Sequence, residues 1–120
     1  MKFTPTQWDI ILHRLGAPDA IAEFLHEEHN LEPAIVERHA YQLQGEPLAS
    51  INSRAFDELE TTIIKECVRG STYFHAIDAQ IGDGDISRSK AAYQVKSMYE
   101  LADMLGIDYS ELPDIDIRPA

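Results

Sequence analysis

The chain lacks several features on which common protein classes depend. Cys67 is the only cysteine among the 120 residues, so no intramolecular disulfide can form. Its six glycines are scattered and form no GxGxxG or GxxxxGK motif, which argues against a phosphate-binding loop. No run approaches the ~18 apolar residues of a membrane span, and no apolar run of a signal peptide follows the first residues. We therefore expect a cytoplasmic protein that does not enter a membrane.

Basic residues are also scarce. Lys and Arg total 10 against 21 Asp and Glu, which gives a formal net charge of −11, and both halves of the chain share the excess of acid. Proteins that bind nucleic acid tightly neutralise phosphates with Lys and Arg, so direct nucleic-acid binding is disfavoured. A negative field of this size favours a basic protein partner.

The hydrophobic pattern predicts an all-α protein of about six helices. Apolar side chains recur at helical spacing near residues 5–15, 18–29, 33–44, 53–69, 73–81 and 88–105. Thr4-Pro5-Thr6-Gln7 fits a capping box at the first helix, and Ser87 is a suitable N-cap for the last. No segment has a convincing strand pattern.

The helices are expected to form one compact, orthogonal or bundle-like domain over residues 1–106. Its first half, residues 1–45, and its second, three-helix half, residues 53–106, are separated by the connector LASIN (48–52). Residues 107–120 contain two prolines and are expected to form an extended tail.

The stretch GDGDIS is similar to part of a calcium-binding loop, in a register covering residues 79–90. That register puts Ala79, Ile81 and Lys90 at positions where calcium needs oxygen ligands. We therefore interpret the stretch as a turn between two helices. It leaves a cluster of acidic residues that could contact a partner, Asp78, Asp83 and Asp85.

A metal site is a further alternative, because Glu23-Phe24-Leu25-His26 matches the Glu-x-x-His element of di-iron bundles. Those bundles need a second copy, which the sequence lacks. His29 and His39 could complete a different transition-metal site only if their helices face each other. We expect neither a metal nor another cofactor, and keep a metal-dependent helical enzyme as the third hypothesis.

Nucleophilic catalysis has little support. Cys67 lies on the apolar stripe of its helix, where a cysteine behaves as a small buried hydrophobe. Ser71 follows a helix end, and no pattern places a base beside it. We expect that the protein is not an enzyme.

The segment HRLGAPDAIAEFLHEEHNLEPAIVERHAYQLQG lies within residues 8–45, which resemble the helix-turn-helix of Cro-type phage repressors. The resemblance implies a DNA-binding regulator whose second helix reads bases with Arg38, Gln42 and Gln44. The family's turn glycine is replaced by His26, and the connection HEEHNL is longer than the family's turn. DNA binding is therefore the second hypothesis.

The last predicted helix has an unusually wide apolar arc. Beside its main seam, Tyr93, Leu101 and Met104 form a second line. A central helix covered on two sides by its own chain would have this pattern, and so would an interface with a partner or a second copy in a homodimer.

Small size, net negative charge and the lack of a catalytic set together favour an interaction protein. The leading hypothesis is an acidic helical protein that binds a basic, nucleic-acid-binding partner and regulates or inhibits it. A regulator of phage or mobile-element type has this profile.

Overall fold

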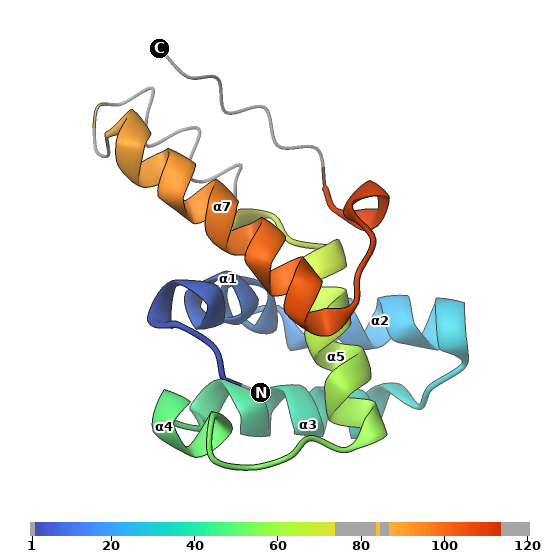
Figure 1. Cartoon of the computed structure of the whole chain (residues 1–120). Coiled ribbons are helices and arrows are strands. Elements are labelled where there is room, and N and C mark those ends of the chain that lie inside the picture. The colour runs from blue at the N-terminus through green and yellow to red at the C-terminus, as the bar shows by residue number, and fades with distance from the viewer. Residues whose placement is uncertain (1, 74–83, 85–86, 114–120) are drawn as a thin grey trace.

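The structure is helical throughout the part of the chain that it describes. The computed structural model describes residues 2–73, 84 and 87–113, and these form six α-helices, one 3₁₀-helix and no strand (Figure 1). The predicted all-α class is confirmed. The fifth predicted helix, over residues 73–81, lies almost wholly outside the described residues. Among the described helices, none is long and apolar enough to cross a bilayer.

The first helix, α1 (Pro5–Leu15), begins where its capping residues predict. The Thr4 hydroxyl accepts a hydrogen bond from the Gln7 N–H at 3.2 Å, and the Gln7 side-chain oxygen accepts one from the Thr4 N–H at 2.9 Å. This reciprocal capping box pairs two backbone amides that a helix start otherwise leaves without partners.

α1 is the central helix and packs against α2 (Pro18–His29), α3 (Pro33–Gly45), α5 (Glu58–Arg69) and α7 (Arg88–Leu105). Because α1 has neighbours on several sides, more of its side chains are buried than the single stripe of a helix that packs on one side only. Ile10 is therefore as fully buried as Ile11, its neighbour in the chain. The buried apolar residues of α1 are Trp8, Ile10, Ile11 and Leu15.

α2 and α3 form an αα-hairpin, in which α3 returns beneath α2 (Figure 1). α2 continues through His29 and ends at Asn30, whose φ of 54° is in the left-handed region. The segment HEEHNL, predicted to make a long connection, is thus mostly helical, and only residues 30–32 join the two helices.

Residues 48–52 differ from the prediction of a connector. They contain the short helix α4 (Leu48–Ile51), whose last residue is fully buried. Asn52, directly after it, holds the start of the chain. Its side-chain oxygen accepts a hydrogen bond from the Phe3 N–H at 2.8 Å, and its amide nitrogen donates one to the Phe3 carbonyl at 2.9 Å.

α5 begins at Glu58, later than the predicted start near Ser53. Asp57 caps it by accepting a hydrogen bond from the Glu60 N–H at 2.7 Å, and the Glu60 side chain completes a capping box. Phe56, predicted to lie within this helix, therefore precedes it, and its ring lies 6.3 Å from that of Phe3. The strong local cap decided where the helix begins.

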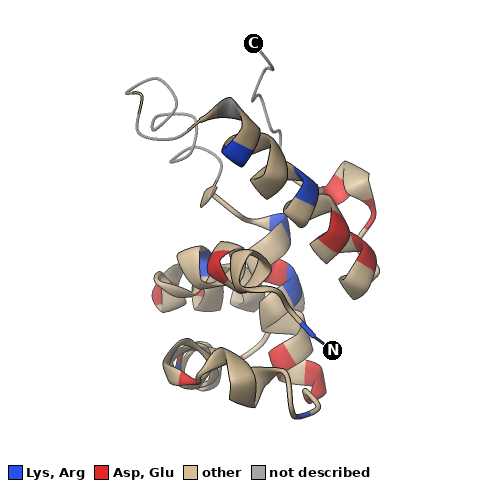
Figure 2. Cartoon of the chain, turned by 60° about the vertical axis from the view of Figure 1, so that its left-hand side comes forward, with Lys and Arg blue, Asp and Glu red and all other residues tan. Residues whose placement is uncertain are grey.

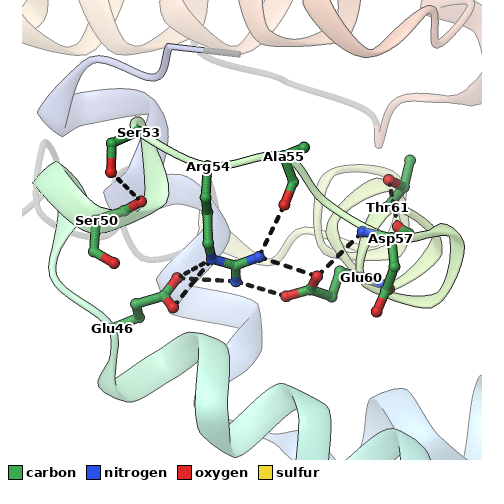
Figure 3. Close-up of polar contacts among 8 residues, drawn as sticks. All are labelled: Glu46, Ser50, Ser53, Arg54, Ala55, Asp57, Glu60 and Thr61. Carbon is green, nitrogen blue, oxygen red and sulfur yellow. Dashed lines mark hydrogen bonds and ion pairs between the residues drawn. The ribbon is translucent and has the colours of Figure 1, made fainter.

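Arg54, in the segment between α4 and α5, forms hydrogen bonds with side chains at the ends of two helices (Figure 3). The Arg54 guanidinium donates to both carboxylate oxygens of Glu60, at 3.1 and 2.6 Å, and its Nε lies 2.9 Å from Glu46. It also donates to the Ala55 carbonyl at 3.1 Å and lies over the Phe56 ring at 5.0 Å. One side chain thus joins the end of α3 to the start of α5.

α7 has the capping residue and the end that the sequence predicts. The Ser87 hydroxyl accepts a hydrogen bond from the Lys90 N–H at 3.2 Å, and Gly106 ends the helix with φ of 69°. The chain then turns back, and the Ile107 N–H donates to the Ala102 carbonyl at 2.9 Å. The predicted extended tail therefore does not begin directly after Gly106. Ile107 turns back toward α7 and is buried in the core.

We predict that Arg54→Met lowers the free energy of unfolding at pH 7 by about 1–3 kcal/mol, because two partly buried carboxylates lose their cation. Chemical denaturation measures this change. Lys96→Met is the matched control, since the Lys96 side chain is 75% exposed and its ion pair with Glu100 is 3.9 Å long. Equal stability of the two variants would contradict the prediction.

The difference in the free energy of unfolding between wild type and Arg54→Met should depend on pH. Hydrogen bonds from Arg54 hold the pKa of Glu60 below its ordinary value. The stabilisation is therefore complete above the ordinary glutamate pKa of about 4.3 and is lost as the pH falls through the lowered pKa. The difference in stability between wild type and Arg54→Met should stay constant between neutral pH and about pH 5 and shrink below about pH 4.

Candidate partner-binding surface

The described part of the predicted tail contains a short 3₁₀-helix, η1 (Tyr109–Glu111). Side chains of the same turn cap its backbone N–H groups. The Asp108 carboxylate accepts hydrogen bonds from the Ser110 N–H at 2.8 Å and the Ser110 hydroxyl at 2.7 Å. Glu111 in turn accepts one from the Asp108 N–H at 3.0 Å. This capping box gives an exposed turn a defined shape.

η1 holds Tyr109 against α7. The Tyr109 hydroxyl lies 2.8 and 2.9 Å from the two carboxylate oxygens of Asp103, to which it donates. Its ring meets that of Tyr99 edge to face, with centroids 4.9 Å apart and planes at 74°. Even so, Tyr109 is 50% exposed and Tyr99 37% exposed. Both rings therefore offer aromatic surface to solvent in a fixed arrangement.

Two contacts attach η1 to the body of the protein. Ile107 is only 4% exposed and belongs to the core, while Leu112 packs partly against it from the other side of the turn. Glu111 also pairs with Arg69 at the end of α5, with 3.3 Å between Nε and the carboxylate. The turn is thus fixed at both of its ends.

Carboxylates surround the two tyrosines. Figure 2 shows acidic residues along the C-terminal part of α7 and the turn after it. A shallow hollow with a volume of about 270 Å³ is lined by Asp103, Ile107, Asp108 and Tyr109. We call the exposed residues of this region the acidic-tyrosine surface: Tyr99, Glu100, Asp103, Asp108, Tyr109 and Glu111.

Hydrogen bonds set the charges of two of these groups. Those donated by Ser110 hold the pKa of Asp108 below its ordinary value. The bond to Asp103 raises the pKa of the Tyr109 hydroxyl above its ordinary value of about 10. At neutral pH, Asp108 is therefore an anion, and Tyr109 is a neutral donor that keeps Asp103 in place.

The line predicted on α7 is not one surface. Leu101 is fully buried, Met104 is partly buried against the core, and only Tyr93 is well exposed, at 56%. The interface interpretation is wrong for Leu101, because α7 packs on both α1 and α5. The alternative, a helix covered by its own chain, accounts for its burial.

The three aspartates of the predicted acidic corner, Asp78, Asp83 and Asp85, lie outside the described residues. Most of the calcium-like stretch does too.

The residues of the metal hypothesis do not converge in the described structure. Glu23, His26 and His29 are exposed on α2, and His39 is half-buried on α3. The His26 and His39 rings each contact a backbone carbonyl through Nδ1, that of Leu31 at 3.1 Å and that of Ile35 at 2.9 Å. Across the described residues, no three potential ligands are grouped where they could hold a metal ion.

The residues of the DNA-binding hypothesis are accessible. Arg38, Gln42 and Gln44 are all exposed on α3. Arg38 is, however, the only Lys or Arg of this helix, whereas phosphate contacts need several such side chains.

Two buried ionisable groups lie on α5. Cys67 is fully buried, and burial raises the pKa of its thiol. Glu66 is only 5% exposed, and burial raises the pKa of its carboxyl although Arg14 and Arg69 oppose this. Its Oε1 lies 2.6 Å from where a Cβ on Gly70 would be, so glycine makes room for the carboxylate.

Comparisons with known proteins give no match: no protein-family model, curated sequence or solved structure is similar to this chain. The acidic-tyrosine surface therefore has to be interpreted from its own residues. It was not predicted from the sequence, since Tyr109 lies in the supposed extended tail. The Asp108–Glu111 capping pattern was the available signal.

We predict that Glu66→Gln raises the free energy of unfolding at pH 7, because burial disfavours the ionised form of the Glu66 carboxyl, which the unfolded chain adopts at this pH. With its pKa raised by folding, the favourable contribution of Glu66 is complete below the ordinary glutamate pKa of about 4.3 and is lost as the pH rises through the raised value. The gain from the substitution should therefore grow from about pH 4 to pH 7.

Chemical denaturation at both pH values measures the gain. Glu27→Gln, on the exposed surface of α2, is the matched control and should change little. A stabilisation of Glu66→Gln that is the same at both pH values would contradict the prediction.

Proposed function

We propose that the protein is a binding module that holds a basic protein partner against the acidic-tyrosine surface and thereby regulates or inhibits a nucleic-acid-binding protein. The observation that carries the proposal is the fixed placement of Tyr109 between Tyr99 and Asp103, with further carboxylates around it. In this proposal the protein performs no catalysis itself.

The rigidity of the surface supports binding. A flexible acidic tail loses conformational entropy when a partner orders it, which weakens the complex. Here the capping box, the buried Ile107 and the Arg69–Glu111 pair hold η1 in place before any partner arrives. Less entropy is then lost on association.

The chemistry of the surface fits Arg and Lys side chains. Aromatic faces attract cations, and an arginine can stack on a tyrosine while it pairs with a neighbouring carboxylate. Exposed rings and carboxylates lie side by side here, because Tyr109 contacts both Asp103 and the Tyr99 ring and directly follows Asp108. A partner with several basic side chains could contact them together.

The same chemistry provides a route to inhibition. The groove in which a protein binds nucleic acid is basic, and carboxylates can occupy it in place of phosphates. The net charge of −11 adds a long-range attraction for such a groove, and this attraction decreases with salt.

The proposal is tested with a fluorescent arginine-rich peptide, titrated with the full chain and followed by anisotropy. We expect the double variant Asp103→Asn/Asp108→Asn to bind about 2- to 30-fold more weakly, since each exposed pair contributes about 0.2–1 kcal/mol. Tyr109→Ala should weaken binding as well, because it removes the aromatic face. Raising the salt should weaken the wild-type complex.

Glu23→Gln/Glu27→Gln is the matched control, because it removes the same charge from the exposed side of α2. Equal losses in the two double variants would show that only net charge matters and would refute a specific surface. Displacement of duplex DNA from the peptide by the wild type then tests the inhibitory role.

A further inference from the structure

The outward face of α3 has few acidic side chains, although the protein as a whole is strongly acidic. Its centre is formed by Ala34, Arg38, Tyr41 and Gly45, all of which are exposed. Tyr41 is 62% exposed, the largest value among the large hydrophobic side chains of the described residues, and Ile35, next to Ala34 in the chain, is 39% exposed. No carboxylate lies on this central line, and Glu37, at its edge, is half-buried.

This composition is typical of a protein–protein interface. Tyr and Arg are enriched at the centres of interfaces, whereas Asp, Glu and Lys are depleted there. The steps from residue 34 to 38, 41 and 45 are four, three and four, the spacing with which one helix packs along another. A helix is therefore the natural partner for this face.

The face is complementary to itself. When two copies of α3 are placed antiparallel about a twofold axis between His39 and Ala40, Arg38 of one copy faces Tyr41 of the other. In the same register, Ala34 faces Gly45, so small residues meet at both ends. The twofold axis duplicates each contact, and both Arg38 side chains gain an aromatic face.

Charge also favours a second copy at this place. Two chains with a net charge of −11 repel each other, and they repel least where the facing surfaces carry no acid. α3 and the acidic-tyrosine surface at the end of α7 lie on opposite sides of the molecule (Figures 1 and 2). A pair joined through α3 thus keeps its acidic surfaces apart and exposed.

We propose that the outward face of α3 forms a twofold homodimer contact, with Arg38 of each copy stacked on Tyr41 of the other. One helix of 13 residues is about 20 Å long and gives a small interface, so the dimer is weak, with a Kd on the order of 100 μM. The inference does not depend on the proposed function.

Sedimentation of the full chain over a range of concentrations tests the contact. We expect a monomer–dimer equilibrium that becomes tighter as salt is raised, because salt screens the repulsion between the copies. Binding at the acidic-tyrosine surface has the opposite salt dependence, so the two results are distinguishable.

Three variants test the register. Arg38→Glu should weaken the dimer about tenfold, because both cation–π contacts are lost. Adding Tyr41→Arg should restore it, since the introduced carboxylate of one copy then faces the introduced guanidinium of the other. Lys96→Glu changes the net charge by the same amount at an exposed position of α7 and is the control, which should weaken the dimer much less. Circular dichroism should show unchanged helix content for all three, because the substituted side chains are exposed.

Several outcomes would overturn the proposal. These are a wild type that is monomeric at every concentration and salt level, an effect of Arg38→Glu no larger than that of Lys96→Glu, or a double variant that is not restored. Binding of duplex DNA that Arg38→Glu abolishes and Tyr41→Arg alone strengthens would instead assign the face to nucleic acid.

Discussion

The burial of α1 is the constraint on which the remaining structure depends. Four other helices pack against it, and Ile10, Ile11 and Leu15 are completely removed from solvent. Its first turn is fixed by the Thr4–Gln7 capping box, and the residue before the cap, Phe3, is held by Asn52. Since α7 is supported by α1 and α5, the orientation of the acidic-tyrosine surface follows from this core.

The helices with strong local signals could be predicted from the sequence. The Thr4–Gln7 box, Ser87 and Gly106 act within one turn of the chain, and the structure has a helix boundary at each of them. Errors arose where tertiary packing decides. Leu101 is buried because α7 has two neighbours, which was one of the two interpretations of its wide apolar arc, and the sequence alone did not decide between them. Phe56 fits a helical stripe but belongs to the extended segment before α5.

The candidate site could be predicted only in part. An excess of acidic side chains at the surface followed from the composition, but the position of the acidic-tyrosine surface did not. The predicted residues on α7 lie elsewhere or in the core, whereas Tyr109 was assigned to an extended tail. Its place depends on the turn after Gly106 and on the distant Arg69, so it requires the three-dimensional structure.

The described charges are distributed unevenly, and this bears on how such an acidic chain can associate. Carboxylates gather where α7 ends, while the outward face of α3 has an arginine and neutral side chains. In our two proposals, one side of the molecule binds cations, and the other is where two anionic copies approach each other. In these proposals, high ionic strength weakens the contact with a basic partner and strengthens the contact between two copies.

The buried Cys67 can report local unfolding of the core through its reaction with a thiol reagent. Its thiol is enclosed by the core, and only a thiolate reacts readily with an alkylating reagent. Alkylation therefore has to wait until α5 separates from its neighbours. With a single cysteine in the chain, the rate of labelling counts the openings of one defined part of the core, without any engineered label.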